Sequence, residues 1–131
     1  MKQYEVVAAI IINENKILCT QRGLSKYSYT SEKYEFPGGK IDIGETKEEA
    51  LIREIKEELE MDINIEKEFF TVHHEYPDFK IIMHSFICKS ENTQLVLKEH
   101  IDFKWLKKEE LFQLDWAGAD IPIVEKLLEL Y

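Results

Sequence analysis

The sequence predicts an α+β fold in which a mixed β-sheet lies between helices. Apolar segments of strand character occur in both halves of the chain, a long amphipathic helix pattern separates them, and a second helix pattern closes the chain. Strands on both sides of a central helix favour one sheet that is covered on both faces. With 131 residues, the chain is expected to form a single domain spanning 1–131.

The first strands are expected before the central helix. Residues 4–12 are almost continuously apolar, which is typical of a strand buried on both faces. Turn-forming residues at 13–16 lead into a hairpin partner at 17–22. The polar segment 23–33 is expected to be a loop, whose tyrosines either cover a ligand or only decorate the surface.

The central helix is expected at residues 46–59, after a short extended piece at 34–36 and a Pro37-Gly38-Gly39 turn. Thr46 followed by Glu49 is a capping-box pattern, which satisfies the first backbone N–H groups of a helix. The sequence therefore predicts that the helix begins at Thr46 and that a glycine turn precedes it.

Four strands are expected after this helix, at residues 63–74, 79–88, 95–97 and 103–106. A helical turn is expected at 108–112. Residues 120–130 contain apolar side chains at helical spacing and are predicted to form the closing helix.

The composition limits the class of partner. The chain has 26 acidic and 17 basic residues, which gives a formal net charge of −9. This balance argues against nucleic acid or an anionic membrane as the main partner, but it allows a phosphate substrate if cations mask the repulsion.

Cys19 and Cys88 lie singly in apolar segments and are expected to be reduced core residues. Because neither a signal-peptide pattern nor an apolar stretch of about 20 residues is present, a cytoplasmic location is expected.

Three glutamates of the central helix share one side of it. With about 100° of rotation per residue, Glu57 lies about 60° to one side of Glu54, and Glu58 lies about 40° to the other. Like charges at this spacing destabilise a helix, whereas a hard cation such as Mg²⁺ prefers carboxylate oxygens. The arc lies next to a predicted core stripe formed by Leu51, Ile52, Ile55 and Leu59.

Two interpretations of this helix remain open from the glutamates alone: a metal site and a solvated acidic surface. The glycine pair before the helix favours the metal site. Glycines let the bare backbone approach a ligand closely and offer carbonyl oxygens to a cation or N–H groups to a phosphate.

The chain resembles the Nudix hydrolases. The residues that match the Nudix signature are Gly39, Glu45, Arg53-Glu54-Ile55, Glu57-Glu58 and Met61. Further segments resemble the MutT branch of that family: EVVAAIII, Gln21-Arg22, Glu35-Phe36-Pro37, Lys98-Glu99 and Ala119-Asp120-Ile121-Pro122. The last of these is similar to bacterial CTP pyrophosphohydrolases within the branch. One departure is Glu60, where the family has glycine because the helix ends in a left-handed conformation.

The resemblance implies a Nudix-type α/β/α sandwich and a Mg²⁺-dependent enzyme, with Mn²⁺ as a second option. Its implied metal ligands are the Gly38 carbonyl, Glu54, Glu57 and Glu58. Glu54 is the implied general base, and the implied catalytic set also contains Arg53, Glu45 and Glu99. Arg53 is expected to orient Glu45 or Glu57, and Glu99 is either an extra ligand or base, or an ordinary surface residue.

The implied substrate contacts are Arg22, Glu35, Phe36, Pro37, Gly38 and Asp120. Arg22 either contacts the nucleotide or is a solvated residue at a strand end. Phe36 either stacks on the base or belongs to the core. Asp120 either accepts hydrogen bonds from the base or caps the closing helix. His100 is a weaker candidate for a phosphate contact.

The implied reaction converts a nucleoside triphosphate into the monophosphate and pyrophosphate, which would cleanse the nucleotide pool. Substrates of the CTP or dCTP type and of the 8-oxo-dGTP type both remain open. A second enzyme hypothesis is a diphosphatase of ADP-ribose, a dinucleotide or a nucleotide sugar. A third is a non-catalytic sensor or RNA-binding regulator, which the intact helical glutamates disfavour. The expected partner is the nucleotide alone, without a stable nucleic-acid or membrane partner, and the chain is expected to be a monomer or a homodimer.

Overall fold

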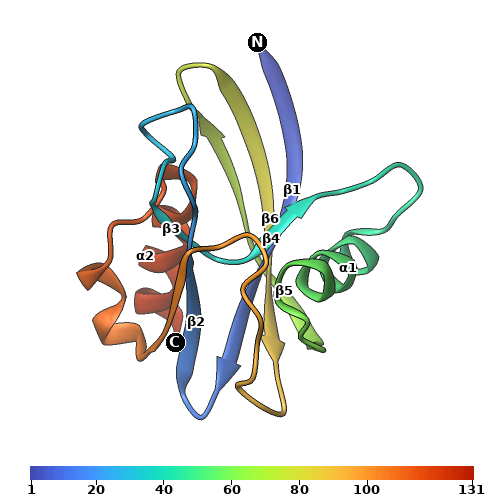
Figure 1. The fold of residues 1–131 in the computed structure, drawn as a ribbon, viewed down its shortest axis with the longest axis vertical. Coiled ribbons are helices and arrows are strands. Elements are labelled where there is room, and N and C mark those ends of the chain that lie inside the picture. Colours follow the sequence, from blue (N-terminus) through green and yellow to red (C-terminus); the bar gives the residue numbers. More distant parts are fainter.

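The computed structural model describes all residues from Met1 to Tyr131. A mixed seven-stranded sheet lies between α1 on one face and α2 with two 3-10 helices on the other, which confirms the predicted fold class (Figure 1). The strands are β1 Lys2–Asn13, β2 Lys16–Gln21, β3 Tyr34–Glu35, β4 Gly38–Lys40, β5 Asn64–Glu75, β6 Phe79–Lys89 and β7 Asp102–Leu106. The helices are α1 Lys47–Leu59, η1 Lys108–Gln113, η2 Gly118–Asp120 and α2 Ile121–Leu130. None of these helices is long and apolar enough to cross a bilayer.

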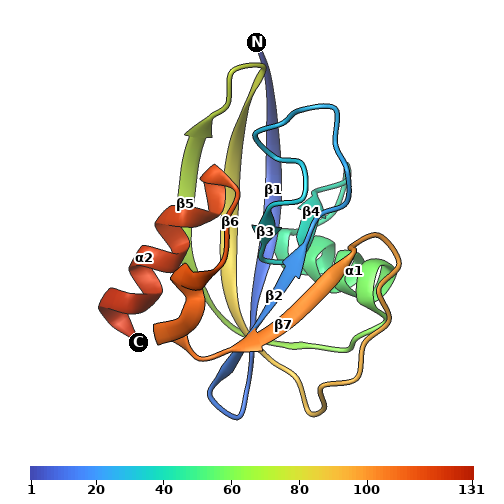
Figure 2. The same cartoon turned by 60° about the vertical axis from the view of Figure 1, so that its left-hand side comes forward.

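The central strand β1 has two different partners on one of its edges. It pairs in parallel with β6 along its whole length, whereas its antiparallel pairing with β2 is confined to the hairpin end at Ile12 and Asn13. Nearer the start of β1, β4 takes the place of β2, with Val7 opposite Gly39. Strands β1 and β2 therefore diverge, and the glycine pair lies in the gap between them (Figure 2).

Burial on both faces explains the apolar character of β1. Ala8 and Ile10 belong to the core cluster on the α2 side, and Val7 and Ala9 belong to the cluster on the α1 side. Successive side chains of a strand point to opposite faces, so each layer receives alternate residues of the same strand. This finding confirms the expected burial on both faces.

Helix α1 begins as predicted, because Thr46 and Glu49 form both hydrogen bonds of a capping box. Its orientation differs slightly from the predicted one: Ile52 is 49% exposed, whereas Ala50 is fully buried. The helix is therefore rolled so that the side bearing Glu58, and not the side bearing Ile52, packs against the sheet. The prediction that Ile52 belongs to the core was wrong.

Two segments differ from their predicted structure. The Gly38-Gly39 pair forms strand β4 instead of a turn alone. Residues 95–97 were predicted to be a strand, but no strand forms there: Val96 N–H donates to Leu59 O at 2.9 Å, and Lys98 N–H donates to Glu58 O at 3.2 Å. The last carbonyls of a helix have no partners within it, so this extended segment pairs with the end of α1 and not with the sheet.

The end of α1 has the left-handed backbone that the resemblance to the family implied, although Glu60 replaces the usual glycine. Glu60 has a φ of 53° and occupies the position where the family has glycine. Its carboxylate lies 2.7 Å from Lys98 Nζ. The ion pair and the two backbone bonds fasten the segment that bears Glu99 to the end of the helix.

Candidate active site

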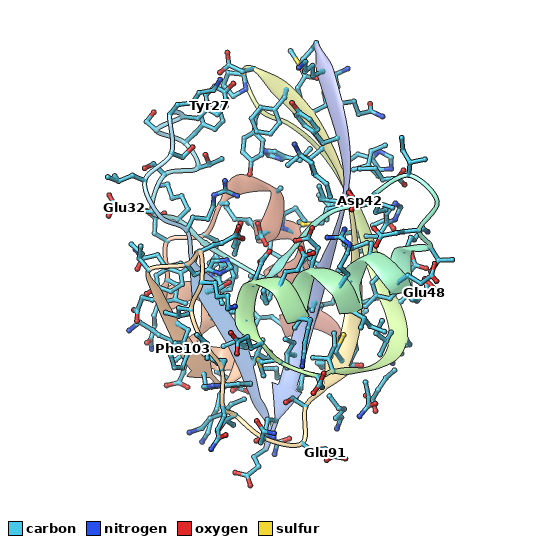
Figure 3. The ribbon with its side chains drawn as sticks, turned by 45° about the vertical axis from the view of Figure 1, so that its right-hand side comes forward. Tyr27, Glu32, Asp42, Glu48, Glu91 and Phe103 are labelled. Carbon is cyan, nitrogen blue, oxygen red and sulfur yellow. The ribbon has the colours of Figure 1, made fainter.

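A cleft of about 630 Å³ opens where β1 and β2 diverge. We call it the central cleft; its lining includes Arg22, Glu35, Phe36, Gly38, Gly39 and Asp120, together with the aromatic residues Tyr4, Tyr27, Tyr76 and Phe79. In Figure 3, the loops that bear Tyr27 and Asp42 stand on opposite sides of the opening above α1. The structure thus brings five of the six predicted substrate-contact residues to one cleft, with Pro37 buried beside them.

The two glycines of β4 allow two different close approaches. A Cβ atom on Gly38 would overlap the carbonyl group of Val7 in β1. A Cβ atom on Gly39 would overlap the carboxylate of Glu54 on α1. Glycine at these positions therefore lets β4 pair closely with β1 and present bare backbone to the acidic side of the helix.

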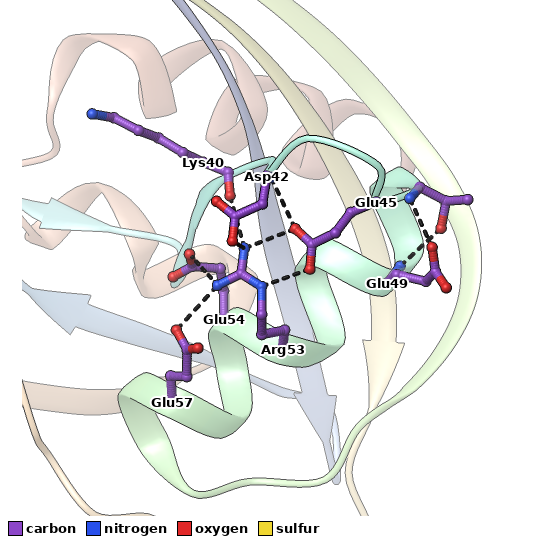
Figure 4. Close-up of polar contacts among 8 residues, drawn as sticks. Lys40, Asp42, Glu45, Glu49, Arg53, Glu54 and Glu57 are labelled. Carbon is purple, nitrogen blue, oxygen red and sulfur yellow. Dashed lines mark hydrogen bonds and ion pairs between the residues drawn. The ribbon is translucent and has the colours of Figure 1, made fainter.

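Arg53 joins the acidic residues around the start of α1 (Figure 4). Its guanidinium donates to Glu45 Oε2 at 2.6 Å, Glu54 Oε1 at 3.0 Å, Glu57 Oε2 at 3.1 Å and the Lys40 carbonyl at 3.1 Å. The hydrogen bond from Arg53 is the main reason why the pKa of Glu45 is lowered. Arg53 contacts both of the carboxylates that it was predicted to orient, and Glu54 as well.

Glu58 is the buried member of the helical glutamates. Its Oε1 atom is buried without a hydrogen-bond partner. Burial, followed by the charges of Glu35, Glu54 and Glu99, raises its pKa to about 9. A dication would favour the ionised carboxylate and supply the partner that this oxygen lacks.

The donor set fits a hard divalent ion, because it consists of carboxylate and carbonyl oxygens around the unpaired oxygen of Glu58. The side chains are not gathered around a common point, since no group of three or more His, Cys, Asp or Glu residues is arranged to hold a metal. Glu54 and Glu57 both point to Arg53 instead. Arg53 engages one oxygen of each carboxylate, so binding of one ion by all three helical glutamates would use their other oxygens.

At the other end of the cleft, Asp120 does not cap α2. Its buried Oδ1 atom accepts the Phe36 N–H at 3.0 Å, and its side chain forms no cap hydrogen bond. Burial and, secondarily, the charge of Glu35 raise the pKa of Asp120 well above its usual value. Phe36 is 3% exposed, and its ring stacks on Trp116 with a centroid distance of 4.7 Å, which places it mainly in the core.

The sequence named the tyrosines of loop 23–33 as one option for covering a ligand, but it did not single out the rest of the aromatic wall of the cleft. Tyr27 and Tyr29 stack at 5.2 Å, Tyr29 and Tyr76 stack at 5.1 Å, and the Tyr29 hydroxyl donates to Asp78 at 2.7 Å. These contacts fasten the loop at 23–33 to the turn between β5 and β6. The aromatic residues Tyr76 and Phe79, on both sides of the turn at Pro77, were the signal that the sequence offered for this wall. Their contact with the distant loop depends on the tertiary structure, so local patterns do not reveal it.

The divided mixed sheet, with its glycine pair set against a carboxylate-bearing helix, is a Nudix-type fold, and similarity to known proteins defines the class of this protein as a hydrolase of phosphoanhydride bonds. The NUDIX domain model matches residues 2–127, and the chain belongs to this family. Members of the family typically depend on divalent metal ions. Within the family, the chain is a MutT-like pyrophosphohydrolase.

Three relatives illustrate the similarity. The chain is 36% identical to a CTP pyrophosphohydrolase of Escherichia coli (strain K12), over 99% of this chain and 95% of the relative. It is 32% identical to an 8-oxo-dGTP diphosphatase of the same strain, over 99% and 100% of the two chains. The solution structure of the MutT protein from methicillin-resistant Staphylococcus aureus 252 is 40% identical, with a TM-score of 0.75 over 98% of each chain.

Proposed function

We propose that this protein is a Mg²⁺-dependent nucleoside triphosphate pyrophosphohydrolase that cleanses the nucleotide pool, with Mn²⁺ as a substitute ion. Its substrates are nucleotides of the CTP or dCTP type or of the 8-oxo-dGTP type. The observation that supports the ion most directly is the buried, unpaired oxygen of Glu58 beside the glycine strand. The nucleotide class is supported by the named activities of the two Escherichia coli relatives.

In this proposal, the residues around the glycine strand bind the cation and activate the attacking water. The Gly38 carbonyl, Glu54, Glu57 and Glu58 hold the divalent cation, which neutralises the charge of the phosphates. Glu54 also accepts the proton of the attacking water, and Arg53 orients its carboxylate through the 3.0 Å contact. The water oxygen forms a bond to phosphorus, the phosphoanhydride bond breaks, and pyrophosphate leaves with the electron pair.

The assay that tests this function is a panel of nucleotides with Mg²⁺, followed by identification of the products. The panel contains CTP, dCTP, 5-methyl-dCTP, 8-oxo-dGTP and ADP-ribose. We expect monophosphate and pyrophosphate from at least one triphosphate, and no product after chelation of the metal. Cleavage of ADP-ribose alone would support the second enzyme hypothesis, and no cleavage of any triphosphate would refute the proposed function.

Replacing Asp120 tests its proposed contact with the base. Asp120→Ala is expected to raise KM roughly tenfold or more for the preferred nucleotide, because the hydrogen-bonding group for the base is lost. Asp120→Asn keeps an oxygen that can accept the Phe36 N–H, so it serves as the control for the local fold. Equal losses for every base in the panel would show that Asp120 holds Phe36 and does not recognise the base.

A further inference from the structure

His100 is a buried histidine behind the wall of the central cleft. Its side chain is 4% exposed, and it is not part of the cleft lining. Its Nε2 atom lies 2.9 Å from Oε2 of Glu35, whereas its Nδ1 atom is buried without a hydrogen-bond partner. An unpaired buried nitrogen lowers stability, so packing alone does not explain a histidine at this position.

The hydrogen bond between the two side chains has a defined direction. The second partner of Glu35 is a guanidinium, which can only donate and favours a carboxylate that accepts, so we infer that His100 Nε2–H donates to Glu35. The other oxygen of Glu35 accepts from Arg22 Nη1 at 3.1 Å. The Glu35 carboxylate is therefore held on two sides. Buried His100 contacts it from behind the cleft, and the partly exposed guanidinium of Arg22 contacts it from the front.

Strand β2 fixes the backbone on both sides of this contact. Thr20 pairs with Glu35 in β3, and its hydroxyl donates to the Glu35 carbonyl at 2.9 Å. On the opposite edge of β2, Ile101 N–H donates to the Gln21 carbonyl at 2.9 Å. The sheet thus brings His100 and Glu35 together and leaves little freedom for either side chain.

Glu35 lies between the two ends of the proposed site. It lines the central cleft together with Arg22, Gly38 and Asp120. A shift of the Glu35 carboxylate would therefore release the guanidinium of Arg22.

We propose that His100 is a positioning residue that fixes the Glu35 carboxylate and, through it, holds the Arg22 guanidinium at the cleft for the phosphates of the nucleotide. The proposal rests on the proposed function and deepens it. It replaces the expectation that His100 itself contacts phosphate, because the ring lies behind Glu35 and outside the cleft lining.

A double-mutant cycle tests this role. His100→Leu removes the donor, whereas His100→Gln retains an N–H group at a similar reach. We expect His100→Leu to lower kcat/KM by about 10- to 100-fold, as is typical for residues that orient a functional group, and His100→Gln to restore most of the activity. In a Glu35→Ala background, His100→Leu should change kcat/KM by no more than about twofold.

The outcomes separate this role from general support of the fold. Wild-type kcat/KM in His100→Leu, or an equal loss in both backgrounds, would overturn the positioning role while the wild-type enzyme remains active. Absence of triphosphate cleavage by the wild type would instead refute the proposed function.

A second measurement does not depend on the folding of any variant. The ¹⁵N shifts of the His100 ring in the wild-type protein without nucleotide should show a protonated Nε2. An Nε2 without a proton cannot donate to Glu35 and would contradict the proposal.

Discussion

Glu58→Gln is expected to abolish Mg²⁺-dependent turnover while leaving the fold intact. Removal of a residue that only orients a metal ligand typically lowers activity by about 10- to 100-fold. Loss of the buried ligand itself should therefore lower kcat by at least about 100-fold. Glutamine has the size of glutamate, and a Glu58 carboxyl with a pKa of about 9 is already neutral at pH 7 in the metal-free protein. The substitution therefore changes little until the cation is added.

The same variant should alter how stability depends on pH. In the metal-free wild type, folding raises the pKa of Glu58 from 4.5 to about 9, so the folded state retains a proton that the unfolded state releases. The stability that this retained proton provides is complete below pH 4.5 and is lost as the pH rises toward about 9. Urea unfolding in the presence of a chelator should accordingly show a shallower decline between these pH values for Glu58→Gln.

Metal binding supplies the readout that is independent of catalysis. A ligand that binds only the folded state stabilises it by about 2.7 kcal/mol at 100 times its Kd, so Mg²⁺ should raise the Tm of the wild type. Glu48→Gln, an exposed change in the first turn of the same helix, is the matched control and should keep both the shift and the activity. A Glu58→Gln variant that retained the wild-type rate and Mg²⁺ shift would remove Glu58 from the proposed metal site.

Local patterns predicted the elements that local chemistry determines. The apolar run of β1 and the Thr46 cap both follow from residues within one element, whereas the left-handed end at Glu60 was implied only by the resemblance to the family. The grouping of Glu54, Glu57 and Glu58 on one side of the helix also follows from helical periodicity. These features need no knowledge of the rest of the chain.

The remaining features depend on contacts between distant residues. A Pro-Gly-Gly sequence has turn chemistry, and only the pairing with β1 makes Gly38 part of a strand. The apolar segment 95–97 pairs with the carbonyls of a helix end, a partner that no strand pattern indicates. Asp120 lies 84 positions from the Phe36 N–H that it accepts, so the capping alternative could be tested only in three dimensions.

Substitutions of the adjacent glycines Gly38 and Gly39 in β4 form the second prediction with a large effect. We expect the first to lower stability and the second to lower activity. In Gly38→Ala, the new Cβ would meet the backbone of Val7, which cannot move without breaking the pairing of β4 with β1. Overpacking of this kind costs about 1–3 kcal/mol or more, so we expect Tm to fall by roughly 5–15 °C.

In Gly39→Ala, the new Cβ would meet the end of the Glu54 side chain, which can rotate away. The fold should therefore persist with a Tm close to the wild type, while kcat falls because the proposed base is displaced. Gly23→Ala is the control, since its Cβ would lie 3.6 Å from Ile101 Cγ2, an ordinary contact. Thermal unfolding and turnover are measured for all three variants. If Gly38→Ala had the same Tm as Gly23→Ala, the close approach of β4 to β1 would not be a property of the protein in solution. If Gly39→Ala kept its full rate, the same would hold for the close approach of β4 to Glu54.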